Sequence, residues 1–455
     1  MHRTSAIRAV DVEDEIGEKI HGLAAEIFPI CRSITGEGVR ETLRCLQRYV
    51  DVQMHEVPSG TRVLDWTVPP EWRVREAFIA DARGRRVVDV ATCNLHLVSY
   101  STSVDEVMPL SALKAHIFTL PDQPDLVPYR TSYYARRWGF CMADRQLQAL
   151  PEGMYRVVID AEHFEGSLTY GEYVHRGACM DEVLLSTHIC HPSLANDNCS
   201  GLALLTYLAR RLSRLETRYT YRFLFVPGTI GAITWLARNE ERLGRIKHGL
   251  VVSCVGDGDG PVYKRSRRGA APIDRAMAHV LRHAGPAARV IDFSPYGYDE
   301  RQYCSPGFNL PVGLFQRGQY GKFPQYHTSA DDLGFIRPEH LAASFRFIVA
   351  ALDVLENDRR LVNVCPKGEP QLGRRGLYDA IGGDRDGPSK SMAFLWLLNL
   401  CDGQHSLLDI AERAAMPFAL IAAAAEILEQ HGLLVDAAPI DRSLGSGTVA
   451  PKGDG

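Results

Sequence analysis

The sequence has no excess of either charge, because its 51 Lys and Arg residues stand against 55 Asp and Glu residues, giving a formal net charge of −4. This balance gives no electrostatic reason to expect a nucleic acid or an anionic membrane as a partner. The sequence also lacks any run of about 18 apolar residues, which excludes a membrane-spanning helix. Residues 1–8 lead into an acidic segment rather than an apolar one, so no secretory signal is expected.

The cysteines lack the spacing of a redox or zinc motif, because the 11 Cys residues are scattered and form no Cys-x-x-Cys pair. Such a distribution is typical of reduced thiols and not of a disulfide framework. Together with the absences above, it predicts a soluble, cytoplasmic protein. The sequence leaves open whether the chain forms a homo-oligomer.

The length of 455 residues predicts two or three domains. Between residues 155 and 357, strand-like apolar runs alternate with helical periodicity, which predicts an α/β fold with a mixed sheet flanked by helices. Residues 58–135 contain short β-type runs broken by Pro, Gly and Asp, which predict a small β-rich insertion. Near the C-terminus, three short helices and a strand edge predict a winged helix. The expected units are a discontinuous main domain (1–57 and 136–362), the insertion (58–135), the winged-helix domain (388–436) and a disordered tail (437–455).

The most informative segment is 186–201, which places imidazole, thiol and carboxylate groups in one loop. The buried strand expected at Val183–Leu185 precedes it, and leucines at helical spacing follow it. The loop therefore lies at the carboxyl end of a strand, where open α/β sheets bind their ligands. Because zinc accepts imidazole, thiolate and carboxylate ligands, the candidates here are His188, Cys190, His191 and Asp197.

Further candidate ligands follow other strands of the predicted sheet, namely Asp257 or Asp259, and His327. Taken singly, each has another explanation, because a loop His or Asp most often stabilises a turn. The run Asn196-Asp197-Asn198 would likewise cap the helix that follows it. Placement after different strands favours a shared site, since those loops can converge.

Four motifs follow one another along the chain, namely His188, Asp197-Asn198-x-Ser200-Gly201, Phe225 to Gly231, and Tyr326-His327-Thr328 followed by Asp332. Their order resembles that of the zinc exopeptidases of the aminopeptidase and glutaminyl-cyclase type. Further segments are Cys31–Gly36, Thr131–Tyr134, Arg137–Cys141 and Asp299–Tyr303. With them, nearly the whole chain is similar to a closer group, the bacterial aminopeptidase-like proteins that carry an inserted β domain and a C-terminal winged helix.

The resemblance implies a site with one or two zinc ions. By position, His188 corresponds to a ligand of the first metal, Asp197 to the bridging carboxylate and His327 to a ligand of the second metal. Two departures stand out. Cys190 replaces an Asp that normally supports the ligand His, and Gly228 with Thr229 replaces two adjacent carboxylates of the broad peptidase clan. The closer group keeps one Glu at position 228, and this chain lacks it.

A hydrolytic metal site normally needs a carboxylate to take a proton from water. With Gly at position 228, the candidates are Glu300, Asp257 and the pair Asp331-Asp332. Glu300 is the expected catalytic residue, because it lies in a polar loop between Asp299 and Arg301. An ion pair between Glu300 and Arg301, or a solvated loop acid, is the alternative.

Five residues are candidates for substrate binding. Four of them are Arg residues, whose planar guanidinium group binds carboxylates and phosphates through paired hydrogen bonds. A solvated basic loop is the alternative for the cluster at 264–268. The winged helix lacks the basic residues that contact phosphates, so docking onto the main domain or a protein partner is expected rather than nucleic-acid binding. The candidate substrate-binding residues are Arg32, Arg265, Arg267, Tyr298 and Arg301.

The sequence and the resemblance together predict a zinc-dependent, aminopeptidase-like hydrolase acting on an amide bond of a peptide or a small aminoacyl compound. The absent Glu at position 228 keeps two alternatives open. One is a catalytically inactive binding or scaffold protein on the same fold. The other is non-hydrolytic amide chemistry on a small metabolite, as in the cyclising relatives.

Overall fold

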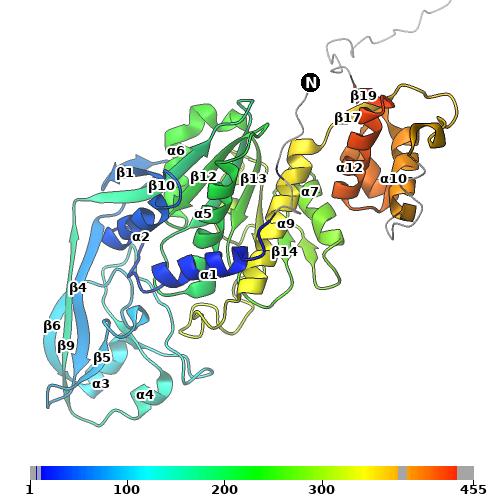
Figure 1. Cartoon of the computed structure of the whole chain (residues 1–455). Coiled ribbons are helices and arrows are strands. Elements are labelled where there is room, and N and C mark those ends of the chain that lie inside the picture. Colours follow the sequence, from blue (N-terminus) through cyan, green and yellow to red (C-terminus); the bar gives the residue numbers. More distant parts are fainter. Residues whose placement is uncertain (1–6, 8–11, 378–386, 438–455) are drawn as a thin grey trace, which may run out of the picture. The chain divides into compact units, whose positions relative to one another are not determined.

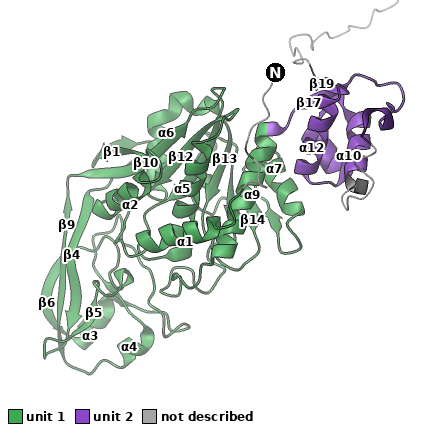
Figure 2. Cartoon of the chain, in the orientation of Figure 1, with its two compact units in different colours: residues 1–356 green, residues 357–455 purple. Residues whose placement is uncertain are grey.

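The computed structural model describes residue 7, residues 12–377 and residues 387–437. The chain divides into two compact units, Met1–Glu356 and Asn357–Gly455 (Figure 2). Among the described residues, no helix combines the length and the apolar character needed to cross a membrane. The first unit contains the candidate ligands, so its architecture determines how they meet.

Within the described residues, a mixed sheet of eight strands forms the centre of the first unit (Figure 1). Its four middle strands are parallel, and the outer strands add antiparallel pairings. The two middle strands Glu182–His188 and Thr220–Val226 are buried at every residue, as expected where helices cover both faces. In spatial order the strands are β1 (Gln53–Pro58), β10 (Ser167–His175), β12 (Thr220–Val226), β11 (Glu182–His188), β13 (Ile246–Val252), β16 (Val312–Gln316), β14 (Val262–Lys264) and β15 (Arg289–Ile291).

Helices pack on both faces of this sheet. One helix connects β11 to β12 and another connects β12 to β13, so the two connections run in opposite directions across the sheet. Because such crossovers are right-handed, these two helices lie on opposite faces. Helix α1 contacts the first of them and lies across the same face (Figure 1). The helices are α1 (Ile16–Ile27), α2 (Glu37–Gln47), α5 (Gly201–Leu212), α6 (Ile230–Asn239), α7 (Pro272–Arg282), α8 (Glu300–Tyr303) and α9 (Pro338–Asn357).

The β-rich insertion forms a second sheet whose longest strands extend from the body of the unit (Figure 1). Its order is β5 (Arg86–Asp89), β4 (Glu71–Ala80), β9 (Met154–Phe164) and β6 (Val104–Pro109). Strand β9 pairs with both β4 and β6. The insertion therefore extends past the boundary expected at residue 135, because its sheet includes β9. The sequence pattern alone assigns that strand to the main domain, where strands alternate with helices. Smaller elements are β2 (Arg62–Val63), β3 (Trp66–Thr67), α3 (Leu110–Leu113), β7 (Ile117–Phe118), β8 (Phe140–Cys141) and α4 (Asp144–Gln148).

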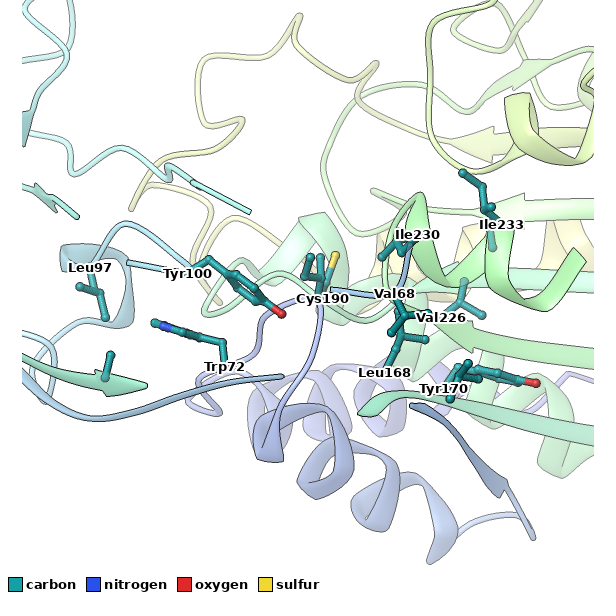
Figure 3. Close-up of a cluster of buried hydrophobic side chains, with 14 of the residues drawn as sticks. Val68, Trp72, Leu97, Tyr100, Leu168, Tyr170, Cys190, Val226, Ile230 and Ile233 are labelled. Atoms are coloured by element: carbon teal, nitrogen blue, oxygen red, sulfur yellow. The ribbon is translucent and has the colours of Figure 1, made fainter. Parts of the chain in front are cut away.

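One hydrophobic cluster joins the insertion to the body of the first unit (Figure 3). On the insertion side, the rings of Trp72 and Tyr100 stack with centroids 5.6 Å apart. On the body side, the cluster includes Cys190 after β11 and Val226 at the end of β12. The loop that carries the candidate ligands is therefore packed against the insertion through a shared apolar core.

The second unit contains the elements of the predicted winged helix. Ser406 begins α11 with a capping box, since its Oγ accepts the Asp409 N–H at 3.2 Å and its own N–H donates to Asp409 Oδ2 at 2.8 Å. The sheet includes a strand at Arg360–Asn363, ahead of the expected start at 388, and the predicted tail lies outside the described residues from 438 onward. The elements are β17 (Arg360–Asn363), α10 (Gly387–Leu400), β18 (Asp402–Ser406), α11 (Leu407–Ala414), α12 (Phe418–Gln430) and β19 (Leu434–Asp436).

We expect the full chain not to bind duplex DNA tightly. Helix α12 contains Glu426 and Glu429 and no Lys or Arg. The nearby Arg359 is engaged, because its guanidinium contacts Glu429 and also lies 2.7 Å from Asp436 Oδ1. Fluorescence anisotropy with a labelled duplex should show no saturable binding between about 50 and 200 mM salt. Tight binding that weakens steeply with salt would overturn this expectation.

Candidate metal centre

Hydrogen bonds fix the loop between β11 and α5 in one conformation. The buried Asp331 carboxylate accepts the backbone N–H of Asn196 at 2.6 Å and that of Asp197 at 2.9 Å, one on each oxygen. Asn198 donates from its side chain to Thr187 Oγ1 at 2.6 Å and to the His188 carbonyl at 3.1 Å. Asn198 Oδ1 also accepts the Gly201 N–H at the start of α5 at 3.2 Å, so the run caps the helix that follows it and in addition ties the loop to the strand end and to a distant segment.

The structure brings three imidazoles around the fully buried Asp197 carboxylate. Oδ1 lies 2.9 Å from His188 Nε2 and 3.5 Å from His191 Nδ1, and Oδ2 lies 3.0 Å from His327 Nε2. One ligand atom from each of His188, His191 and Asp197 lies within 4.8 Å of the other two. The predicted ligands therefore meet, with His191 as a fourth member, although about 130 residues separate the loop from His327.

The geometry around Asp197 fits a divalent cation. Oδ1 is buried and accepts no hydrogen bond of acceptable geometry, despite the imidazole nitrogen 2.9 Å away. Ligand atoms about 2.0 to 2.2 Å from a tetrahedral zinc are separated by roughly 3.3 Å, which is close to the spacings in the group of His188, His191 and Asp197. On the other side, Oδ2 and His327 Nε2 provide two ligand atoms, so this half of the site is less complete than the first.

The protonation states also suit a metal. Burial alone would raise the pKa of Asp197, but the surrounding imidazoles outweigh it and hold that pKa well below its usual value. Burial lowers the pKa values of His191 and His327. A carboxylate and neutral imidazoles are the forms that bind zinc.

The insertion contributes directly to this site through the segment around Tyr129. The Tyr129 N–H donates to the His327 carbonyl at 2.8 Å, and Val127 and Ser329 exchange two further hydrogen bonds. The Tyr129 ring contacts both His191 and His327, with each pair of centroids 5.1 Å apart. His327 is therefore held in place by residues almost 200 positions earlier in the chain.

Tyr298, one of the predicted substrate-binding residues, lies at the site. Its ring stacks on His188 with centroids 5.0 Å apart and an interplanar angle of 15°. Its hydroxyl lies 3.0 Å from Cys254 Sγ. Tyr298 thus packs against His188, whereas Tyr129 packs against His191 and His327.

Arg32 has a different place from the one expected of a substrate-binding residue. Only 1% of it is exposed. Its Nε donates to the His191 carbonyl at 3.0 Å and its Nη2 donates to Cys199 Sγ at 3.1 Å, while Nη1 bonds the Ile27 carbonyl. Arg32 therefore fixes the backbone of His191. Its guanidinium is buried, and all three of its nitrogens bond groups of the chain, so it is not available to bind a substrate.

The other Arg candidates make no contact with the candidate ligands among the hydrogen bonds and ion pairs of the described residues. Arg267 donates to Asn309 Oδ1 at 3.2 Å. Asn309 precedes β16 and so lies at the amino ends of the parallel strands, whereas the histidines follow their carboxyl ends. Arg265 donates to the carbonyl of Gly269, within its own loop. Arg301 lies on α8, and its Nε is buried without a hydrogen-bond partner among the described residues.

The carboxylates expected to act as a base are already engaged. Glu300 is fully buried, with its Oε1 2.6 Å from the equally buried Lys264 Nζ, so an ion pair exists with Lys264 rather than with Arg301. Burial raises the pKa of Glu300, and Lys264 opposes this shift. Asp257 accepts hydrogen bonds from Asn196, Gly318 and Asp259, and Asp331 holds the ligand loop as described above.

Comparison with known proteins supports the resemblance seen in the motifs. A family model described as a domain of unknown function, DUF4910, matches residues 21–358. The chain belongs to the DUF4910 family. A winged helix-turn-helix model matches residues 359–436, which confirms the predicted C-terminal module and includes strand β17 in it.

Individual relatives show which fold this DUF4910 chain has. It is 49% identical over 420 residues to a Clostridium acetobutylicum protein provisionally named a polysaccharide biosynthesis protein with an aminopeptidase-like domain, covering 92% of the chain and 96% of the relative. A crystal structure from the same species, provisionally named a peptidase, matches with a TM-score of 0.88 and 47% identity over 93% of this chain and 97% of that one. A zinc aminopeptidase of Bacillus subtilis matches with a TM-score of 0.57 at 14% identity, over 77% of this chain and 95% of that one. The aminopeptidase-like fold is confirmed.

In this DUF4910 chain, the position of the absent Glu is next to His188, one of the candidate metal ligands. A Cβ atom placed on Gly228 would lie 3.6 Å from His188 Cβ and 3.3 Å from Cys190 Sγ. The Gly228 N–H donates to the same Cys190 Sγ at 3.2 Å. A side chain at 228 would therefore begin beside His188, which agrees with the position that the resemblance gives to the catalytic carboxylate.

Three contributors to the site are absent from the residues that the resemblance assigns to it. His191 is among the candidate ligands in the sequence, and its spacing of three residues from His188 is the signal that favours it. Tyr129 has no such signal, because it reaches the site only through the pairing of two distant loops. Asp299 has only the signal of a polar neighbour of Glu300 in the sequence, but its carboxylate accepts the N–H of Thr229, the residue after Gly228, at 2.7 Å.

Proposed function

We propose that this chain is a cytoplasmic zinc-dependent hydrolase that cleaves an amide bond next to a free amino group, on a peptide or a small aminoacyl compound. The observation that carries this proposal is the buried Asp197 carboxylate, with His188 and His191 at one oxygen and His327 at the other. The aminopeptidase-like fold supports it. When bound, zinc would polarise the scissile carbonyl and favour ionisation of water.

The residues of the chain prepare this site in several ways. His188, His191 and Asp197 would hold the principal ion, and His327 orients the second Asp197 oxygen or contributes to a second ion. Burial excludes bulk water and strengthens each electrostatic interaction. Tyr298 and Tyr129 limit the directions from which a substrate can approach the histidines.

A second candidate function is a binding protein that keeps the metal without turnover. The observation that favours it is Gly228, which provides no carboxylate beside His188. The two candidates differ in one measurable respect, because both retain zinc and only the first hydrolyses an amide.

Metal removal tests the proposed function. We expect the purified full chain to contain about one zinc ion and to hydrolyse at least one member of a panel of aminoacyl anilides, dipeptides and aminoacylated amino sugars. The sugars belong in the panel because the Clostridium relative is named for polysaccharide biosynthesis. A chelator should abolish hydrolysis, and added zinc should restore it. Hydrolysis that survives chelation, or a protein that binds no zinc, would refute the proposal, whereas zinc without hydrolysis would favour the binding protein.

A further inference from the structure

Asp299 is a buried carboxylate that follows Tyr298 and lies immediately before α8, and only 3% of it is exposed. Its Oδ1 accepts the N–H of Thr229 at 2.7 Å. Thr229 has a φ of +65°, a left-handed conformation that a β-branched residue rarely adopts. Such backbone geometry is concentrated at functional sites, and here it directs one N–H at a carboxylate.

The position of Asp299 relates it to the missing Glu. Thr229 follows Gly228, whose absent side chain would begin beside His188 and Cys190. Tyr298, the residue before Asp299, stacks on the His188 ring. The segment 298–299 therefore places a ring on the candidate ligand His188 and a carboxylate against the backbone N–H of the residue after Gly228.

The second oxygen of Asp299 is available for chemistry. Among the described residues, Oδ2 has no hydrogen-bond partner, whereas Asp257 and Asp331 have both oxygens engaged. Burial, opposed by the Thr229 N–H, raises the pKa of Asp299 to about 7. A general base works best when its pKa lies near the working pH.

The titratable groups around Asp299 come from two elements. Glu300 and Arg301 on α8 exert opposite influences on its charge. The Tyr303 hydroxyl and the Cys190 thiol also interact electrostatically with Asp299, and burial raises the pKa of each of these two groups, so both remain neutral near pH 7. The pKa of Asp299, raised to about 7, therefore makes it a group of this cluster whose charge changes near pH 7.

We propose that Asp299 replaces the missing Glu as the proton acceptor of the amide hydrolysis. This inference rests on the proposed function. One O–H bond of water breaks and its proton passes to Asp299 Oδ2, while the water oxygen bonds to the carbonyl carbon. The C–N bond then breaks, and Asp299 returns the proton to the leaving nitrogen. The products are a carboxylic acid and an amine, and Asp299 is a carboxylate again.

The first test compares Asp299→Asn with the neighbouring Glu300→Gln. Asn keeps an oxygen for the Thr229 N–H, so the local fold is preserved while the proton acceptor is lost. We expect kcat to fall by roughly 100-fold or more in Asp299→Asn, with zinc content unchanged. The wild-type kcat should rise with pH through a limb near 7, because the acceptor must be ionised, and Asp299→Asn should lack that limb. A kcat within about threefold of wild type would exclude Asp299 from the reaction.

A rescue variant separates a chemical role from a structural one. Adding Gly228→Glu to Asp299→Asn supplies a carboxylate at the position used by the closer aminopeptidase-like group, and it should recover at least about tenfold of the lost kcat. The Cys190 thiol needs to move by only a few tenths of an ångström, because the new Cβ lies 3.3 Å from its sulfur. Loss without rescue, in a protein that still binds zinc, would assign Asp299 a structural role and overturn the proposal.

Proton-linked calorimetry provides a readout that does not depend on turnover. Leucine hydroxamate is titrated into the zinc-loaded full chain, well above pH 7, in buffers of different ionisation enthalpy. With Asp299 as acceptor, the hydroxamate proton stays in the complex and wild type releases close to zero protons, whereas Asp299→Asn releases about one. Equal release from the two proteins would overturn the proposal. A wild type that binds zinc and hydroxamate but hydrolyses nothing would instead count against the proposed function alone.

Discussion

Replacing Asp197 by Ala is expected to lower zinc affinity by more than roughly 100-fold and to abolish hydrolysis. Loss of a supporting group around a metal ligand already costs about 10 to 100-fold in affinity, and Asp197 is itself the central ligand. Its two oxygens lie 2.9 to 3.5 Å from the nitrogens of His188, His191 and His327. Without it, three buried imidazoles would face one another with no anion to balance a dication.

Competition with a fluorescent zinc chelator measures this loss, and Asp292→Ala provides the control. Asp292 is almost fully exposed, and its one described ion pair, with Arg265, is 3.6 Å long. We expect this control to match the wild type in zinc affinity and in kcat. Asp197→Ala protein that still binds zinc as tightly as the control would show that the metal lies elsewhere.

Replacing Asp331 by Asn is expected to destabilise the first unit and to weaken the metal site without removing any ligand. An amide has one acceptor oxygen, whereas both Asp331 oxygens accept backbone N–H groups, from Asn196 and Asp197. One buried N–H would therefore face the NH₂ group of the new residue, which should lower the free energy of unfolding by about 1 to 3 kcal/mol. Zinc affinity should fall by about 10-fold or more, because the Asp197 backbone loses its anchor.

The adjacent carboxylate offers a matched control for this substitution. Asp332 is exposed, and a single oxygen, Oδ1, accepts the N–H groups of Gly334 and Phe335. Asp332→Asn can keep both hydrogen bonds, so its urea midpoint and its zinc affinity should equal those of the wild type. Equal midpoints and affinities for Asp331→Asn and Asp332→Asn would contradict the role given to Asp331.

Much of the fold could be predicted because its strands and helices have strong local signals. The buried strand before His188 and the helix after Gly201 follow directly from apolar runs and leucine spacing. The winged-helix elements at 407–414 and 418–430 are equally periodic. The resemblance to aminopeptidase-like proteins assigned residues that are distant in the sequence to one site, so His188, Asp197 and His327 could be expected to meet.

The remaining features depend on tertiary contacts that no local pattern contains. Arg32 looks like an anion-binding residue in the sequence, but the fold buries it against the His191 carbonyl. Glu300 has a partner 36 residues earlier, Lys264, and the pair is hidden from solvent. The sequence pattern of β9 is that of a strand of the main sheet, but β9 pairs with β4 and therefore belongs to the insertion. Each of these contacts joins segments that are far apart in the chain.

Anomalous diffraction at the zinc edge, from crystals of the full chain grown with zinc, tests the metal centre most directly. The account predicts one strong peak between His188 Nε2, His191 Nδ1 and Asp197 Oδ1, within about 2.0 to 2.3 Å of each atom. A weaker second peak beside His327 would be compatible with the bridging position of Asp197. A map with no peak among these four residues, in crystals that bind zinc elsewhere or not at all, would contradict the account.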